Sequence, residues 1–209
     1  RTGKHLGIDV SKHNGTIDWQ EVKKAGVEFA IIRVGNRGVQ DGSLHSDPYA
    51  IRNLQEAKAA GLKLGVYFYS QALNAREGEE EARHAVALVR QSGIRLDLPV
   101  FMDYEYYTTT SGRLALAHIS KDRATEAAQA FYRYVTQEGY QSGIYASKSF
   151  FYEQLHPDQL SGVIWLAHYS RNLRTDYKGN FNLWQYSSTG HVPGIQKGKG
   201  NVDMNVLYE

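Results

Sequence analysis

The chain has no cysteine, no long apolar run and little net charge. The absence of cysteine excludes a disulfide framework and thiolate metal sites, and it leaves the cellular compartment open. No stretch approaches the roughly 18 consecutive apolar residues of a membrane-spanning helix. A net charge of +2, with scattered basic residues, is too mild to indicate nucleic-acid binding. These absences exclude membrane-spanning, disulfide-stapled and nucleic-acid-binding proteins.

Several common catalytic motifs are also missing. The sequence contains no H-E-x-x-H, no Walker-type loop and no G-x-S-x-G elbow. The eight histidines do not cluster, and each is better explained as a surface or hydrogen-bonded residue than as a metal ligand. We therefore predict no metal site and no serine nucleophile.

What is present indicates one α/β domain. At 209 residues, with 42% hydrophobic and 22% charged content, the chain can bury one sizeable core, so we predict a single catalytic domain over residues 1–209. Five apolar segments are each followed by a helical pattern, which is typical of parallel strands joined by helices. The predicted strands are 6–11, 29–35, 62–70, 98–105 and 142–147. The predicted helices begin at the N-cap Asp18, at the Ser-Asp-Pro segment 46–48, at Ala75 and at Ser120, and a short helical stretch runs up to Leu160.

After the fifth unit the pattern changes. Segments 163–170, 181–188 and 202–209 have strand character, but the chain between them has no helical period. The connection 171–180 is short for a parallel crossover, so we expect the last three strands to pair at least partly antiparallel. Five βα units alone fit either a barrel or a doubly wound sheet, and eight strands favour closure. The predicted architecture is an irregular TIM-like barrel, (β/α)5(β)3.

The segment LPVFMDYE, residues 98–105, carries the clearest chemical signal. Alternate residues of a strand point to the same face, so Asp103 and Glu105 would lie with their α-carbons roughly 6.5 to 7 Å apart. Two carboxylates that share a small volume raise the proton affinity of at least one, and glycoside hydrolysis requires such a proton donor beside a second carboxylate. Taken alone, the pair is also compatible with two solvated acids at a strand end.

Acids and aromatic residues recur at the ends of the other predicted strands. In a barrel of this kind the C-terminal strand ends form the active face, and strand eight would bring its start there if it runs antiparallel. Polar groups among aromatic rings are typical of a sugar-binding groove, although each aromatic residue alone could simply fill the core. The candidates are the acids Asp9, Asp103, Glu105 and Asp203, and the substrate-binding residues Tyr67, Tyr69, Tyr145, Trp165, Tyr169, Trp184, Gln185 and Tyr186.

In their order along the chain, these motifs resemble one known family. GIDVSKHNGTIDW, FAIIRVG, GVYFYS, PVFMDYE, GIYAS, WLAHY, LWQYSS and the closing VDMN are similar to glycoside hydrolase family 25, the Chalaropsis-type lysozymes, over essentially the whole chain. The resemblance implies a cofactor-free β-1,4-N-acetylmuramidase that cleaves peptidoglycan between N-acetylmuramic acid and N-acetylglucosamine. It implies that Glu105 is the general acid, Asp103 its partner, and Asp9 and Asp203 the flanking acids.

The resemblance carries further expectations and some departures. It implies an antimicrobial or wall-lysing monomer that acts outside the cell, either secreted or phage-delivered, and a start without methionine suggests a processed or trimmed chain. It also favours retention of configuration with substrate assistance, while direct carboxylate attack stays open. His168 and the aromatic pair Tyr106-Tyr107 depart from the family pattern. Two alternatives remain: a glycan-binding module with an inert groove, and a metal-dependent phosphodiesterase that chelators would inhibit.

Overall fold

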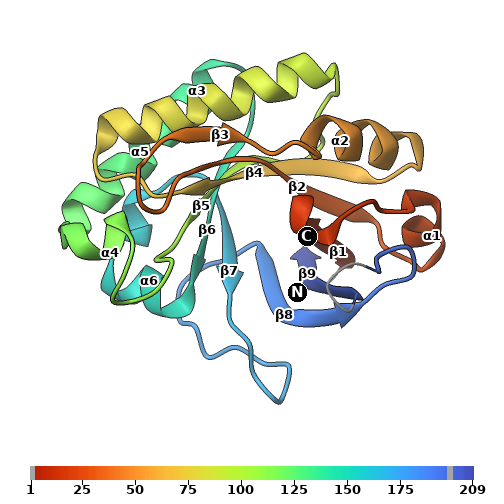
Figure 1. Cartoon of the computed structure of the whole chain (residues 1–209). Helices are drawn as coiled ribbons and strands as arrows, with labels where there is room; N and C mark the ends of the chain where they lie inside the picture. Colours follow the sequence, from red (N-terminus) through yellow and green to blue (C-terminus); the bar gives the residue numbers. More distant parts are fainter. Residues whose placement is uncertain (1–2, 197–199) are drawn as a thin grey trace.

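A computed structural model describes residues 3–196 and 200–209 of the chain. Within these ranges the strands form one sheet in the order β1-β9-β8-β7-β6-β5-β4-β2-β3, and β1 also pairs with β2. This last pairing closes eight strands into a barrel, to which β3 adds as an extra strand on β2 (Figure 1). The strands are β1 (Lys4–Val10), β2 (Phe29–Arg37), β3 (Leu44–Ser46), β4 (Lys63–Ser70), β5 (Val100–Tyr104), β6 (Ser142–Ser147), β7 (Val163–Ala167), β8 (Leu183–His191) and β9 (Asn201–Tyr208).

Each of the first five units has its predicted helix. These are α1 (Trp19–Lys24), α2 (Ala50–Ala59), α3 (Ala75–Ser92), α5 (Lys121–Gln137) and α6 (Lys148–Glu153), with short 3-10 turns at Lys12–Asn14 and Pro157–Gln159. The short helix α4 (Arg113–Ala117) and the strand β3 were not predicted, because five and three residues are too few to show a period. The irregular α/β barrel with five βα units and three strands without helices is confirmed.

The start of the second helix differs from the prediction. Asp18 caps α1 as expected, whereas α2 begins after Tyr49 without a side-chain cap. Asp47 Oδ1 accepts from the Tyr49 N–H at 2.8 Å, directly ahead of α2, while Oδ2 accepts from Arg33 Nε at 2.9 Å and from the Lys12 N–H at 3.0 Å. Asp47 thus holds the turn that leads into α2 and also ties β2 to the turn after β1, and the second role required knowledge of the tertiary structure.

The pairing of the last three strands was only partly predicted. β9 runs antiparallel to both β8 and β1, as expected for part of the set. However, β7 and β8 are parallel, so the argument from a short connection is wrong at this point. β7 ends three residues earlier and β8 begins two residues later than predicted, which leaves residues 168–182 as the connection. That length meets the dozen or so residues that a parallel crossover needs, and it does so without a helix.

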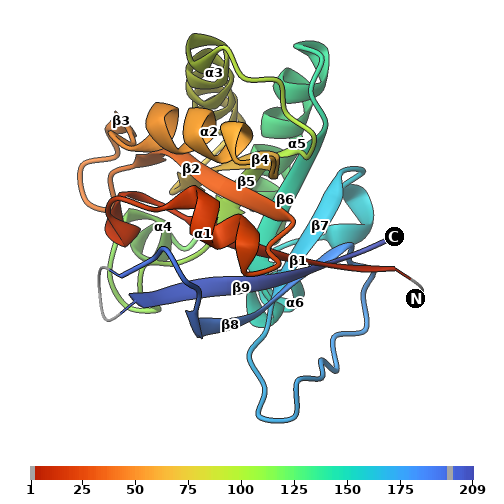
Figure 2. The same ribbon diagram turned by 90° about the vertical axis from the view of Figure 1, so that its right-hand side faces the viewer.

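The helices cover only part of the barrel. Figures 1 and 2 show α2, α3 and α5 over the outer side of β2, β4, β5 and β6, while β8 and β9 have no helix over them. Helices α3 and α5 approach closely at Gly78, where an added Cβ would lie 2.1 Å from the Ala127 carbonyl oxygen. No helix of the described ranges has the length and apolar character to cross a bilayer.

A cluster of large side chains fills the barrel interior. It is built around Trp165, whose ring centroid lies 5.0 Å from that of Phe101, 4.7 Å from that of Tyr145 and 6.1 Å from that of Tyr67. Edge-to-face contacts of this kind stabilise a pair by about 0.5 to 1.5 kcal/mol beyond burial alone. This aromatic layer forms a fixed floor on which polar residues at the strand ends are held.

Candidate active site

A pocket of about 300 Å³ opens at the C-terminal ends of the parallel strands, and all four predicted acids line it. Asp9 comes from β1 and Asp103 from β5, Glu105 follows the end of β5, and Asp203 stands near the start of β9. Because β9 is antiparallel to β1, Asp203 is the Cα partner of Asp9. The other predicted residues in the lining are Tyr67, Tyr69, Tyr145, Trp165 and Gln185.

The sheet register explains why these side chains converge. Tyr69 pairs with Asp103, Asp103 with Tyr145, and Tyr145 with Trp165, so one row of residues crosses β4, β5, β6 and β7. Residues at equal height in a barrel point to the same side, and this row points inward over the aromatic floor. The row therefore places a buried carboxyl group between two tyrosines.

Asp9 is held by a chain of hydrogen bonds. Its Oδ2 accepts from Gln185 Nε2 at 2.7 Å and from Asn205 Nδ2 at 2.9 Å. Gln185 Oε1 in turn accepts from the hydroxyl of Tyr145 at 2.6 Å, and Asn205 Oδ1 accepts from Trp165 Nε1 at 2.7 Å. Since each amide is oriented by an aromatic donor, the position of Asp9 is fixed by residues from four other strands.

Asp103 and Glu105 share a proton-binding site. Burial raises the pKa of Asp103 well above its ordinary value, and the charge of Glu105 adds to this rise. Burial also raises the pKa of Glu105, while its hydrogen bond with Asp103 acts in the opposite direction. Burial therefore makes both carboxyl groups hold a proton more tightly than an exposed acid would. Asp103 Oδ1 is buried and has no hydrogen-bond partner among the described residues.

The second pair of acids behaves in a similar way. Burial raises the pKa of Asp9 well above its usual range, the charge of Asp203 adds to the rise, and the hydrogen bonds from Asn205 and Gln185 counter it. Burial raises the pKa of Asp203 as well, and its hydrogen bond with Asp9 opposes this. Four carboxyl groups in one pocket thus titrate as an interacting set.

Three predicted substrate-binding residues lie outside this pocket. Tyr169 is half exposed at its edge and donates from its hydroxyl to Gln185 Oε1 at 2.5 Å. Trp184 and Tyr186 flank Gln185 on β8 and belong to the cluster outside the barrel, where their ring centroids lie 5.9 Å apart. Side chains alternate along a strand, so a strand that directs Gln185 inward directs Trp184 and Tyr186 outward. Trp184 and Tyr186 therefore do not line this pocket, contrary to the prediction.

The sequence-based candidates missed Asn205 and Arg33. Asn205 lies two residues after Asp203, so the same alternation that selected the D-x-E pair could have selected it. Arg33 lines the pocket from β2 and pairs with Asp47 at 2.9 Å. A single charge within the apolar run FAIIRVG was the available signal for Arg33. Four further lining residues, Ser11, His13, Asn14 and Asn201, had no such signal.

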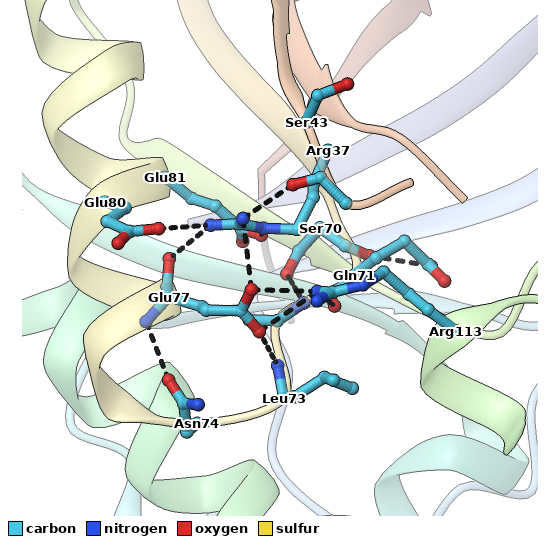
Figure 3. Close-up of polar contacts among 12 residues, drawn as sticks. Arg37, Ser43, Ser70, Gln71, Leu73, Asn74, Glu77, Glu80, Glu81 and Arg113 are labelled. Carbon is cyan, nitrogen blue, oxygen red and sulfur yellow. Dashed lines mark hydrogen bonds and ion pairs between the residues drawn. The ribbon is translucent and has the colours of Figure 1, made fainter. Parts of the chain in front are cut away.

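A buried ion cluster supports the strand end that carries Glu105 (Figure 3). Gln71 Nε2 donates to the backbone carbonyl of Glu105 at 2.8 Å. Arg113 Nη1 donates to the Gln71 carbonyl at 2.9 Å and to both carboxylate oxygens of Glu77 at 3.0 Å. The cluster also contains Arg37, paired with Glu77, Glu80 and Glu81. The backbone next to the D-x-E pair is therefore anchored to α3 through these ions.

The acids do not form an evident metal site. In the part of the chain that the structure describes, no three His, Asp or Glu side chains are grouped so that they could hold a metal ion. The raised carboxyl pKa values also disfavour metal binding, which requires deprotonated ligands. The arrangement is suited to proton transfer between paired carboxyl groups beside an aromatic-lined cavity.

Comparison with known proteins places this geometry in a family. The autolytic lysozyme of Clostridium acetobutylicum is 29% identical over 206 residues, which cover 97% of this chain and 56% of the relative. Lysozyme M1 of Streptomyces globisporus is 28% identical over 207 residues, covering 95% of this chain and 66% of the relative. This chain thus spans less than two thirds of the length of either relative.

A solved structure agrees with the sequence relatives. The modular autolysin LytC from Streptococcus pneumoniae, in complex with a synthetic peptidoglycan ligand, superposes with a TM-score of 0.83 at 29% identity. The superposition covers 98% of this chain and 47% of the autolysin. The sequence profile of Glycosyl hydrolases family 25 matches residues 8–195, which include three of the four pocket acids. The chain therefore belongs to family 25 of the glycosyl hydrolases.

Proposed function

We propose that this chain is a lysozyme, a β-1,4-N-acetylmuramidase that hydrolyses the bond between N-acetylmuramic acid and N-acetylglucosamine in bacterial peptidoglycan. The observation that carries the proposal is the group of four carboxyl side chains in one aromatic-lined pocket, with raised pKa values. Lysozyme-named relatives support the substrate class. We also propose that the chain acts as a monomer outside the cell, on the cell wall.

Glu105 is the proposed general acid and Asp103 the residue that orients the substrate's 2-acetamido group. The buried Asp103 Oδ1 lacks a partner among the described residues, so an acetamide N–H could donate to it without displacing a protein contact. The acetamide oxygen then bonds to the anomeric carbon while the glycosidic C–O bond breaks and Glu105 protonates the leaving oxygen. Water, deprotonated by Glu105, opens the cyclic intermediate from the same face, which gives retention.

Substrate binding also supplies the proton in the required place. We infer that Asp103 holds the proton in the free protein, because Asp103 is buried and lies beside Glu105, and both effects raise its pKa. An N–H donor stabilises the ionised form of a carboxyl group, so a bound acetamide shifts Asp103 toward the carboxylate. The proton then passes to Glu105, whose pKa the adjacent negative charge raises. Glu105 can therefore act as the general acid only when a 2-acetamido sugar is bound.

Mass spectrometry of digested peptidoglycan tests the proposal. A muramidase creates new reducing ends on N-acetylmuramic acid, and Glu105→Gln should create none above background. A glycan-binding module on the same fold would bind wall fragments and leave the turbidity of a cell-wall suspension unchanged. A metal-dependent phosphodiesterase would lose activity with a chelator, whereas the proposed enzyme should not.

A further inference from the structure

A second pocket lies on the other side of Glu105. Its volume is about 280 Å³, and among the described residues Glu105 alone lines both this pocket and the pocket with the four acids. The second pocket is formed by the loop that follows β5 and by the start of α6 after β6. Both segments follow C-terminal strand ends, so the two pockets open on the same face of the barrel.

The second pocket has a fixed floor and one exposed aromatic wall. Tyr106 is held by Phe150, with ring centroids 5.2 Å apart, and by Gln154, whose Oε1 accepts its hydroxyl at 2.5 Å. The next residue, Tyr107, is 62% exposed although it lines the pocket. A large apolar ring that is left in solvent beside a proton donor offers a stacking surface for a pyranose.

The rest of the lining indicates the charge of the occupant. The hydroxyl-bearing residues Thr108, Thr109, Ser147 and Ser149 contribute to the lining, and Glu153 adds a second carboxylate to that of Glu105. This lining has two acids and no basic side chain, whereas the lining of the first pocket includes Arg33 and His13, so an anionic sugar is better accommodated in the first pocket. In peptidoglycan, N-acetylglucosamine is uncharged, whereas N-acetylmuramic acid carries a lactyl carboxylate or its peptide.

From this geometry we propose that the second pocket, with Tyr107 as its stacking residue, binds the uncharged 2-acetamido sugar on the leaving side of the cleaved bond. This inference rests on the proposed function. A general acid must lie between the retained sugar and the leaving sugar, because it protonates the oxygen that joins them. The pocket with Asp103 holds the retained sugar, and the pocket beyond Glu105 receives the leaving one.

The test compares two substrates that share the same retained sugars. One substrate releases an N-acetylglucosamine unit, and the other is the β-glycosyl fluoride, which releases only fluoride and leaves the second pocket empty. Tyr107→Ala should lower kcat/KM about threefold to tenfold for the sugar-leaving substrate, as expected for one stacking contact, and should change the fluoride by less than about twofold. Tyr107→Trp should preserve the sugar-leaving rate.

The control variant is Tyr152→Ala. This tyrosine is 45% exposed and is carried by α6, but it does not line either pocket, so both substrates should keep their rates. Equal loss on both substrates with Tyr107→Ala, or no loss on either, would overturn the leaving-side site. If the wild-type protein hydrolyses neither substrate, the proposed function itself fails, which is a different result.

Discussion

Glu81, in the ion cluster of Figure 3, is expected to reduce the stability of the folded chain at neutral and alkaline pH. Its side chain is fully buried, and Oε2 accepts from Arg37 Nε at 2.7 Å. Burial raises the pKa of Glu81 from 4.5 to about 7, and the charge of Arg37 only partly offsets this. A buried ion pair with a desolvation cost larger than its Coulomb gain is a common outcome.

The pH dependence follows from proton linkage. The folded chain holds the Glu81 proton up to a higher pH than the unfolded chain does, so folding binds a proton between pH 4.5 and about 7. The free energy of unfolding therefore falls as the pH rises through this window and stays low above it. At roughly 1.36 kcal/mol per pKa unit, the loss amounts to about 3 kcal/mol.

Glu81→Gln should remove this dependence. The amide keeps the shape of the side chain and stays neutral, so it mimics protonated Glu81 at every pH. Relative to wild type, the variant should gain about 3 kcal/mol in free energy of unfolding between pH 4 and pH 8, since the other acids titrate alike in both proteins. The measurement is urea-induced unfolding at the two pH values, followed by tryptophan fluorescence.

Glu80→Gln is the matched control. Glu80 pairs with the same Arg37, at 3.0 Å, but 41% of its side chain is exposed. An ion pair on the solvent side contributes at most about 1 kcal/mol, so this variant should show less than a third of the Glu81 effect. If Glu81→Gln is destabilised as much at pH 8 as at pH 4, the pair with Arg37 outweighs the burial of Glu81, and the reasoning is refuted.

Three further predictions concern catalysis. Glu105→Gln should lower kcat on peptidoglycan fragments by at least about 100-fold, which is the usual contribution of general acid catalysis. The midpoint of thermal unfolding at pH 7 should not fall. If the variant lyses cell walls at the wild-type rate, Glu105 is not the general acid. The rate of hydrolysis should follow a bell-shaped pH profile. Asp9→Asn should move the alkaline limb of this profile to lower pH, because the charge of Asp9 raises the pKa of Asp103. If the limb does not move, Asp9 lies outside the coupled set of carboxyl groups. De-N-acetylated glycan strands should be cleaved slowly, because they lack the acetamido oxygen that attacks the anomeric carbon. A 2-fluoro glycosyl reagent should leave the intact mass of the protein unchanged. A stable adduct on Asp103, Asp9 or Asp203 would instead establish direct carboxylate attack.

Local patterns predicted most of the elements and the centre of the site. The start of α3 and both ends of β6 agree with the prediction, since a long amphipathic period and a short apolar run are both visible in the chain itself. The pairing of Asp103 and Glu105 on one face also follows from local alternation. The ion pair of Asp47 with Arg33 and the phase of β8, which turns Trp184 outward, were not predicted because both depend on neighbours in the barrel.

The sequence by itself determined the fold class, the chemical character of the strand ends and the D-x-E pair, because these depend on residues within a few positions of one another. The tertiary structure alone decided which distant groups meet. Closure of the barrel makes Asp203 the partner of Asp9. It also brings Gln185 and Asn205 against Asp9, where Tyr145 and Trp165 orient their amides. It also buries these acids, and burial is the first cause of their raised pKa values. A strand pattern cannot encode that desolvation, since it arises only when separate segments exclude water from a common space.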